Sequence, residues 1–392
     1  MAIKEEVRAD GIGRYPTGSV RYWKLVMIGH KRREQIMGFF VMKIGRTLGM
    51  LLLLSLIGGC GSDDTSSKEP ADRQAQLAAK LQKVLVAAIT DQRWLPGVAA
   101  AVDWPFTGLH WSGAAGVGNV QSGVVLRPEF SFRTASVTKT FLAAAVHRVV
   151  EQGKVSLEDS LDQLLAEAER TLLKNYGYRV DRITVAQLLA HTSGLPDYAE
   201  SQQYIEAVLA DPTRRWTRYE QLAFALKNFM RKGEPGQVFS YSDTGYLLLG
   251  EIVERWGGLS LADTYRHVLN FAQLGLSSTW LESLEPIPPG AGPRMSQYLN
   301  DLDITTADPS FDLYGGGGLV STVVDLNRFI SALFDKRVVS AASLNSMMTV
   351  TLEPHAGRGL LKYNLDGVDC WGHEGYWGVL MLLRQFWISG SA

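Results

Sequence analysis

Hydrophobic positions in the front half of the chain recur first with a helical period and then in short runs. Over residues 71–91 the apolar side chains share one face, which predicts an amphipathic helix. They are Leu77, Leu81, Val84, Leu85 and Ala88. Residues 96–104 and 108–117 are short apolar runs punctuated by glycine and proline, with a turn at 105–108 between them. They predict two antiparallel strands at the edge of a sheet.

The middle of the chain changes from wholly apolar to mixed patterning. Residues 137–150 are almost all apolar and Gly153 follows, which predicts a helix that is buried on all sides and ended by a glycine. Residues 151–303 contain more polar helical segments and predict a mainly helical domain. The four glycines at 315–318 and a capping pattern that opens a helix over 322–334 then predict a return to the first domain.

Together these patterns predict an α/β (α+β) protein with an antiparallel sheet flanked by helices. Residues 72–150 and 304–392 would form the sheet domain, with late strands at 366–371 and 376–383. Residues 151–303 would form the helical domain.

The first 59 residues differ from the rest in charge. They hold ten basic and four acidic residues, whereas the remainder holds 29 and 36. An apolar run over 48–59 follows Lys43 and Arg46 and ends in Gly-Gly before Cys60. This is the layout of a secretion signal, and the run is shorter than the roughly 20 apolar residues that a membrane-spanning helix needs.

The end of that run resembles the lipobox of bacterial lipoproteins. The resemblance implies a signal peptide over 42–59 and a lipidated Cys60 that anchors the protein to a bacterial membrane on the extracytoplasmic, periplasmic side. Residues 60–71 read as a flexible tether. Because such signals begin near the initiating methionine, residues 1–41 are predicted to be a superfluous extension from a misassigned start site. The alternative is an apolar segment that ends in Gly-Cys by chance.

Composition narrows the class of protein. The 392 residues are 46% hydrophobic and 20% charged, which is typical of globular proteins. The 39 basic and 40 acidic residues nearly cancel, so there is no electrostatic case for nucleic-acid binding. With Cys60 lipidated, only Cys370 remains, so no disulfide is expected within the mature chain.

Ser136 and Lys139 form an S-x-x-K pattern at the start of the apolar helix. Three-residue spacing puts the hydroxyl and the amine on one helix face. A serine hydroxyl needs a base, and a desolvated lysine can supply one. Backbone N–H groups at the helix start also favour negative charge beside the hydroxyl. The pattern predicts a nucleophilic serine, and the alternative is a serine that only caps the helix.

Tyr241-Ser242-Asp243 lies between two predicted elements. A phenol near a lysine ammonium ionises more easily, so Tyr241 is a candidate for carrying a proton between Ser136 and the leaving group. Alternatively, Asp243 only caps the helix that follows and Tyr241 only packs.

Residues 371–376, Trp-Gly-His-Glu-Gly-Tyr, form a glycine-flanked segment in a strand-like stretch. Glycines would let a substrate lie against the strand edge. His373 can offer a proton donor to a substrate carboxylate, and the Tyr376 N–H can pair with that of Ser136 as an oxyanion hole. Alternatively, the histidine is structural.

In this order, S-x-x-K, a Y-x-N-like segment and H-x-G resemble the class C β-lactamase and serine D-Ala-D-Ala carboxypeptidase family. The likeness spans residues 72–383 and includes four further segments. They are Phe132–Ala135, Leu188–Leu195, Tyr246–Gly250 and Gly317–Thr322. The resemblance implies the β-lactamase/transpeptidase-like fold of the penicillin-binding proteins.

By position, the resemblance also implies roles for individual residues. Ser136 would be the acylated nucleophile, with Lys139 and Tyr241 as base and acid. The implied substrate-binding residues are Asp243, His373, Gly375 at the strand edge, and Tyr376. No cofactor and no metal is implied. His191 and Arg133 belong to matching segments but are left out of the catalytic set.

Three features depart from the family pattern. Asp243 stands where the family usually has asparagine, and an ionised carboxylate only accepts hydrogen bonds. His373 replaces the lysine of the K-T-G form, which resembles the peptidase and esterase branches more than efficient β-lactamases. The family continues beyond the third motif with another strand and a long helix, whereas 17 residues follow Gly375 here, so a truncated C-terminal end is expected.

The leading prediction is therefore a serine hydrolase that forms an acyl-enzyme on Ser136. Its substrates would be D-Ala-D-Ala-type peptides, such as peptidoglycan stem peptides, or related β-lactams, amides and esters. One alternative is an esterase of the same fold. The other is a non-catalytic envelope protein that keeps the cleft to bind muropeptides.

Overall fold

The computed structural model describes residues 21–29, 69–91, 95–105, 108–299, 302–365, 368–377 and 380–388. Of residues 21–29, 69–71, 365, 368 and 380–388 it describes the backbone alone. The predicted signal peptide and Cys60 lie outside these residues. Among the helices in the described ranges, none is both long and apolar enough to cross a membrane.

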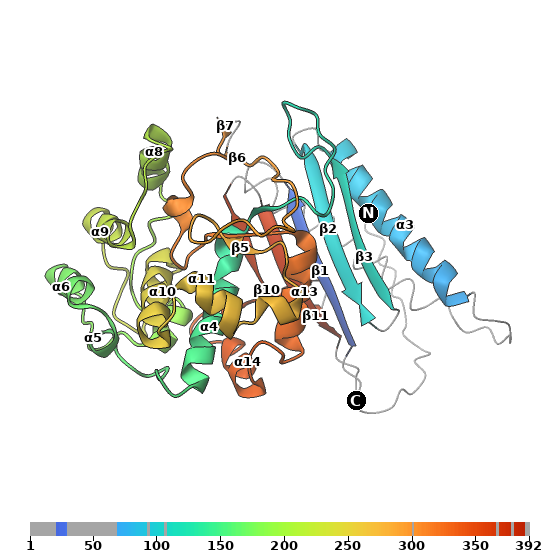
Figure 1. Cartoon of the computed structure of the whole chain (residues 1–392). Coiled ribbons are helices and arrows are strands. Elements are labelled where there is room, and N and C mark those ends of the chain that lie inside the picture. Colours follow the sequence, from blue (N-terminus) through green and yellow to red (C-terminus); the bar gives the residue numbers. More distant parts are fainter. Residues whose placement is uncertain are drawn as a thin grey trace, which may run out of the picture.

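A six-stranded antiparallel sheet organises the molecule, in the order β3-β2-β1-β11-β10-β9 (Figure 1). Its strands are β1 (Arg21–Gly29), β2 (Gly97–Trp104), β3 (Leu109–Gly116), β9 (Leu361–Leu365), β10 (Val368–Tyr376) and β11 (Leu380–Ile388). The first predicted strand pair is confirmed as β2 and β3. The late strands are longer and later than predicted, and the whole H-x-G segment lies within β10.

Strand β1 comes from the N-terminal part of the chain. Residues 1–41 were predicted to be superfluous, but Arg21–Gly29 lies in the middle of the sheet. It pairs with β11 along its whole length and with β2 from Lys24 to Gly29. The alternation of apolar and polar residues could not reveal the position of this strand in the sheet, because the sequence does not show which strands pair when they lie far apart in the chain.

Helices cover both faces of the sheet. Strand β2 is buried on both sides, and its alternate residues point to opposite cores. Val98, Ala100 and Val102 join the apolar face of α3 (Glu69–Asp91), and Ala99 and Ala101 join the main core on the other side. Helix α13 (Val323–Phe334) packs on that second side, against β1, β2 and β11. The amphipathic helix predicted over 71–91 is thereby confirmed, although it starts at Glu69, inside the expected tether.

The main core also joins the sheet to the helical part of the chain. Helix α4 (Thr138–Glu151) runs through it with nearly every residue buried, as its apolar sequence predicts. The helices of residues 151–303 lie around α4, on the side of the molecule away from α3 (Figure 1). They are α5 (Leu161–Leu164), α6 (Glu167–Asn175), α7 (Val185–Leu189), α8 (Gln202–Ala210), α9 (Arg218–Asn228), α10 (Asp243–Gly257), α11 (Leu261–Asp263), η4 (Thr264–Val268) and α12 (Phe271–Leu274).

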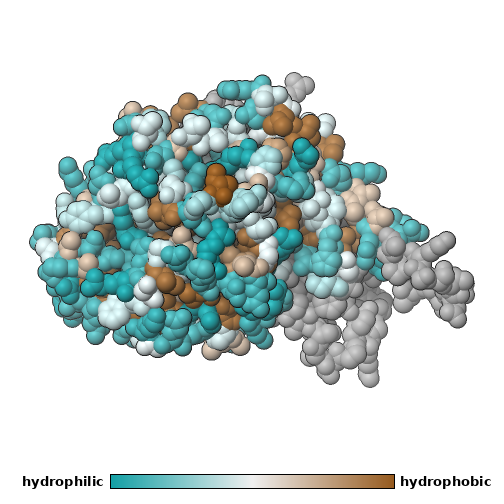
Figure 2. Space-filling model, viewed as in Figure 1, coloured by the Kyte–Doolittle hydropathy of each residue, from teal (hydrophilic) through white to brown (hydrophobic). Residues whose placement is uncertain are grey.

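Short elements complete the fold and fix the start of α4. A three-stranded sheet has the order β4-β8-β5, and a further pair is formed by β6 and β7. The remaining elements are β4 (Phe132–Arg133), η3 (Ala135–Val137), β5 (Trp280–Leu281), β6 (Tyr298–Leu299), β7 (Leu302–Asp303), η5 (Pro309–Asp312), β8 (Leu319–Ser321) and α14 (Ala341–Met347). The face in Figure 2 is mostly hydrophilic, with small hydrophobic groups between polar residues.

Candidate active site

Ser136 lies half-buried in η3, directly before α4. A backbone hydrogen bond holds this turn, and one of its residues is strained. The Thr134 N–H donates to Leu319 O at 2.7 Å, which ties the turn to β8. Ala135 has φ of 45°, a left-handed conformation that costs a non-glycine residue energy and is kept only where its surroundings enforce it. The residue after this strained position is Ser136, which lines a cavity.

Lys139 brings the first two motifs together. Its side chain is fully buried, and its ammonium donates three hydrogen bonds. The acceptors are Ser136 Oγ at 2.9 Å, Asp243 Oδ1 at 2.5 Å and Gly316 O at 2.8 Å. An ammonium has three N–H donors, so all are used. The glycine run explains part of this fit, since a Cβ at Gly316 would lie 2.2 Å from Asp243 Oδ1.

Tyr241 lies beside both residues of the first motif. Its hydroxyl is hydrogen-bonded to the Ser136 side chain, and the Lys139 Nζ lies 5.1 Å from the centroid of its ring. The expectation that the nearby ammonium eases ionisation of the phenol is wrong for this resting site. Burial, and then the charge of Asp243, raise the pKa of Tyr241 well above its usual value. Tyr241 is therefore a neutral phenol in the resting site.

Strand β10 forms the opposite wall. His373 is buried, and its ring centroid lies 6.4 Å from that of Tyr241. The His373 Nδ1 is 2.6 Å from Glu374 O. At Gly375 the strand passes very close to the helix start, because a Cβ there would lie 2.5 Å from Thr134 O and 3.1 Å from Ser136 N. Only glycine allows this approach, which brings the Tyr376 end of the strand next to Ser136.

This contact yields a first prediction. Gly375→Val is expected to push β10 away from the Ser136 turn and to lower the rate of Ser136 acylation at least about a hundredfold, the scale of losing an oxyanion donor. Overpacking of this kind should also cost about 1–3 kcal/mol of stability. Labelling kinetics with a fluorophosphonate and thermal melting measure the two effects. Gly290→Ala is the control, since the nearest atom to its added Cβ is 3.9 Å away; equal rates for both variants would contradict the prediction.

His191, which was left out of the catalytic set, is a buried support for Tyr241. Its ring stacks on Tyr241 at 4.3 Å and on Tyr246 at 5.0 Å between centroids. Its Nδ1 accepts the Ser242 N–H at 3.0 Å. Burial, and then the charge of Lys139, lower the pKa of His191 well below its usual value, so the imidazole is neutral. Arg133 is likewise structural in its contacts, with an ion pair to Glu282 at 2.6 Å and bonds to the carbonyls of Ile304 and Ala307.

Two further carboxyls lie near the Lys139–Asp243 ion pair. The Asp243 N–H donates to Asp197 Oδ1 at 3.0 Å. Burial and the charge of Asp243 raise the pKa of Asp197 to about 7 and that of Asp312 to about 8. Near neutral pH, Asp312 is therefore mostly protonated and Asp197 is divided between its two forms. Both positions lie in loops or short turns with no motif that could reveal them.

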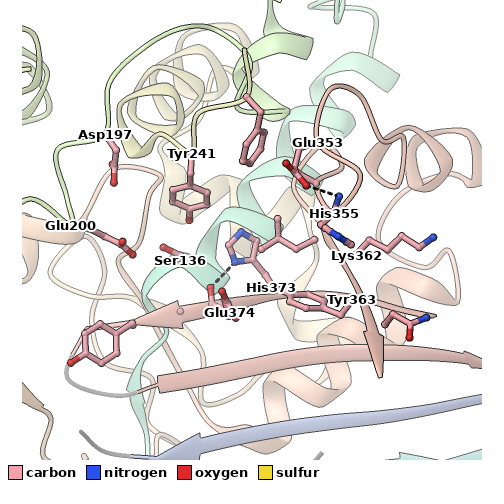
Figure 3. A pocket seen from close by; sticks show the side chains of 16 residues that line it. Ser136, Asp197, Glu200, Tyr241, Glu353, His355, Lys362, Tyr363, His373 and Glu374 are labelled. Carbon is pink, nitrogen blue, oxygen red and sulfur yellow. Dashed lines mark hydrogen bonds between the residues drawn. The ribbon is translucent and has the colours of Figure 1, made fainter. Parts of the chain in front are cut away.

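A cavity of about 570 Å³ opens in front of Ser136. Figure 3 shows Ser136, Tyr241 and His373 converging on it, with Asp197 and Glu200 on one side and Glu353, His355 and Lys362 on the other. Of the predicted site residues, Ser136, Tyr241, His373, Gly375 and Tyr376 line it. Lys139 and Asp243 are not among its lining residues and lie buried behind it. Sequence reasoning missed the lining residues Asp197, Glu200, Phe239, Glu353, His355, Lys362 and Tyr363.

In the described part of the chain, no three His, Cys, Asp or Glu side chains are placed to hold a metal ion. The groups that do converge are a hydroxyl, an ammonium, a phenol and an imidazole. Such a set can activate a serine, transfer its proton and orient a carbonyl for attack.

This fold, with a serine that is hydrogen-bonded to a lysine at the start of the buried helix, is that of a serine hydrolase. Sequence comparison gives the family. The profile described as Beta-lactamase matches residues 79–385, and the chain belongs to this family. The resemblance inferred from the three motifs and the predicted fold class are thereby confirmed.

Curated relatives are similar at moderate identity. Penicillin-binding protein 4* of Bacillus subtilis (strain 168) is 28% identical over 240 residues, which cover 56% of this chain and 49% of that protein. Penicillin-binding protein 4 of Amycolatopsis lactamdurans is 27% identical over 321 residues, which cover 74% and 76%. The match therefore spans about half the length of the Bacillus protein.

Solved structures agree with the fold. The D-stereospecific amidohydrolase from Streptomyces sp. superposes with a TM-score of 0.64 at 26% identity, over 79% of this chain and 94% of that one. The D-amino acid amidase from Ochrobactrum anthropi SV3, complexed with L-phenylalanine, gives a TM-score of 0.64 at 25% identity, over 78% and 90%.

Proposed function

We propose that this protein hydrolyses amide bonds through a covalent acyl-enzyme on Ser136, with D-Ala-D-Ala-type peptides or related amides and esters as substrates. The observation that carries the proposal is the 2.9 Å hydrogen bond between Lys139 Nζ and Ser136 Oγ, at the edge of a cavity large enough for a peptide end. The names of the relatives support it, since they include penicillin-binding proteins and an amidase for D-amino acids.

The proposed mechanism uses the residues around that bond. Ser136 Oγ attacks the scissile carbonyl, and Lys139 and Tyr241 serve as base and acid that move its proton to the leaving group. The backbone N–H groups of Ser136 and Tyr376 stabilise the oxyanion. Water then releases the acyl group by the reverse proton path.

Substrate contacts are proposed on the wall formed by β10. His373 would donate to a carboxylate or carbonyl of the substrate, and Gly375 would let the substrate lie against the strand. Asp243 was predicted from the sequence to contact substrate, but it is buried against Lys139, and we propose that it acts through that lysine instead. An esterase of the same fold and a non-catalytic muropeptide-binding protein remain the alternatives, because the same cavity can hold those ligands.

We also propose that the protein works outside the cytoplasm. The signal-like run before Cys60 supports this location. Lipid anchoring at that cysteine would require the cleaved segment that contains β1 to stay bound between β2 and β11. The penicillin-binding proteins among the relatives agree with a substrate found in the cell envelope.

A covalent probe tests the acyl-enzyme. The wild-type protein is expected to be labelled by a fluorescent penicillin or a fluorophosphonate, and Ser136→Ala is expected to lose labelling completely while it melts as the wild type does. Ser277→Ala, at an exposed serine, is the control and should be labelled normally. A folded wild-type protein that takes up neither probe would favour the non-catalytic alternative. Turnover of a D-alanyl peptide, nitrocefin and a p-nitrophenyl ester then ranks the substrates.

A further inference from the structure

We propose that Asp243 is the third member of a proton relay, Ser136–Lys139–Asp243, and takes the proton that the Lys139 ammonium must lose before it can act as base. The proposal rests on the proposed function. It starts from the departure at Asp243, where a carboxylate stands in place of the family's usual amide.

The resting geometry poses the problem that the relay solves. Lys139 donates to three acceptors, so its nitrogen carries all three protons and has no lone pair for the Ser136 hydroxyl. Tyr241, the other candidate base, is held neutral by burial. Neither of the two residues proposed as base is therefore free to take the Ser136 proton in the resting site, and Lys139 must lose a proton before it can act.

Asp243 is the group placed to receive that proton. Its Oδ1 lies 2.5 Å from Nζ, and both side chains are almost fully excluded from solvent, at 0% and 4% exposure. In such a dry site a buried ion pair has lost most of its solvation, so conversion to a neutral amine and carboxylic acid costs far less than it would in water. The amide of an asparagine cannot accept a proton in this way.

The step balances without a further reactant. The proton moves from Nζ to Asp243 Oδ1, and the Lys139 lone pair then takes the proton of Ser136 as Oγ bonds to the scissile carbonyl carbon. The carbonyl π electrons move to its oxygen. When the intermediate collapses, the leaving group takes a proton from Lys139, directly or through Tyr241. The Asp243 proton then returns to the amine and restores the ion pair.

The surroundings of Lys139 favour protons on carboxyls. Several titratable groups of the packed elements interact with Lys139: Asp243 and Tyr246 of α10, Asp312 of η5, and His191, Asp197 and Tyr241 of the loops. His373 of β10 interacts in turn with His191 and Tyr241. The pKa of Asp312 is about 8 and that of Asp197 about 7, so this cluster already holds protons on carboxyls near neutral pH. The only ammonium among these groups is Lys139.

Asp243→Asn tests the relay, because it keeps the size of the side chain and removes the proton acceptor. We expect fluorophosphonate labelling of Ser136 at pH 7 to slow at least about a hundredfold, the usual effect of losing a base. Without Asp243, the Lys139 proton must go to solvent, so the labelling rate of the variant should rise with pH between pH 7 and 9. Wild type should change much less over this range. A merely structural defect would not be rescued by pH, and because Asp312 also loses its proton near pH 8, the same rise is expected when Asp312→Asn is added to the variant.

Asp312→Asn is the matched control. This carboxyl is buried in the same cluster but is protonated at pH 7, so the replacement removes no charge and should leave the rate within about twofold. If Asp243→Asn does not fold, Asp243→Ser provides the same test, since serine suits a helix start.

The outcomes separate the relay from the proposed function. Labelling of Asp243→Asn as fast as wild type, or faster, overturns the relay and leaves the acyl-enzyme intact. A folded variant that stays slow at every pH also overturns it and assigns Asp243 a structural role. If the wild-type protein itself is never labelled, the proposed function fails and the relay fails with it.

Discussion

Replacing Lys139 by methionine is expected to abolish acylation of Ser136 and to lower the free energy of unfolding by about 3–5 kcal/mol. The first effect follows from removal of the amine that contacts Ser136 Oγ at 2.9 Å. The second follows because the variant has lost the lysine that pairs with Asp243, so this carboxylate would stay buried with no opposite charge in contact. Labelling kinetics and chemical denaturation measure the two effects.

A double variant separates these two consequences. Lys139→Met with Asp243→Asn removes both charges, so much of the lost stability should return, because a buried ion pair can be replaced by neutral groups at little cost. Activity should not return, since no amine is restored. If the single variant kept the wild-type stability, the ion pair would not be buried as described, and recovery of labelling in the double variant would remove Lys139 from the mechanism.

The sequence pointed to most of the residues that converge at the candidate site because each of them belongs to a local pattern. Ser136 and Lys139 are three residues apart on an apolar helix, and Gly375 is needed where β10 passes the Ser136 turn. The contacts between motifs depend on the tertiary fold and were not predictable in detail. The 2.5 Å bond between Lys139 and Asp243 joins residues 104 positions apart, and Asp197 reaches the cluster from an irregular loop.

The protonation states were the weakest part of the sequence interpretation. A nearby ammonium was expected to ease ionisation of Tyr241. Burial and Asp243 oppose it more strongly, and neither the depth of the phenol nor the charge beside it can be read from spacing alone. The same limit applies to His191. Histidine is a common catalytic residue type, but the contacts of His191 are those of a residue that supports Tyr241 and the backbone of Ser242.

The predicted signal peptide and the fold disagree about strand β1. The run that ends at Cys60 predicts cleavage of the chain before that residue, which would remove Arg21–Gly29. The fold uses these residues as a central strand between β2 and β11. Both cannot hold for the same folded molecule unless the cleaved segment stays bound.

A chain that begins at Cys60 is therefore expected to fold poorly. Loss of β1 would leave the facing edges of β2 and β11 unpaired and uncover the part of α13 that packs on it. Each backbone hydrogen bond contributes about 0.5–1.5 kcal/mol, so the loss would approach the roughly 5–15 kcal/mol of net stability that a domain has. The expected result is an aggregated or molten protein without a cooperative melting transition.

Two companion chains show whether the strand itself is responsible. A chain that lacks only residues 1–20 keeps β1 and should melt as the full chain does. A synthetic peptide of residues 21–29, added to the chain that begins at Cys60, should restore cooperative melting and labelling of Ser136, because the slot between β2 and β11 accepts an antiparallel strand on both sides. Normal melting and labelling of the chain that begins at Cys60, without peptide, would instead show that β1 is dispensable and that cleavage at the predicted signal is compatible with the fold.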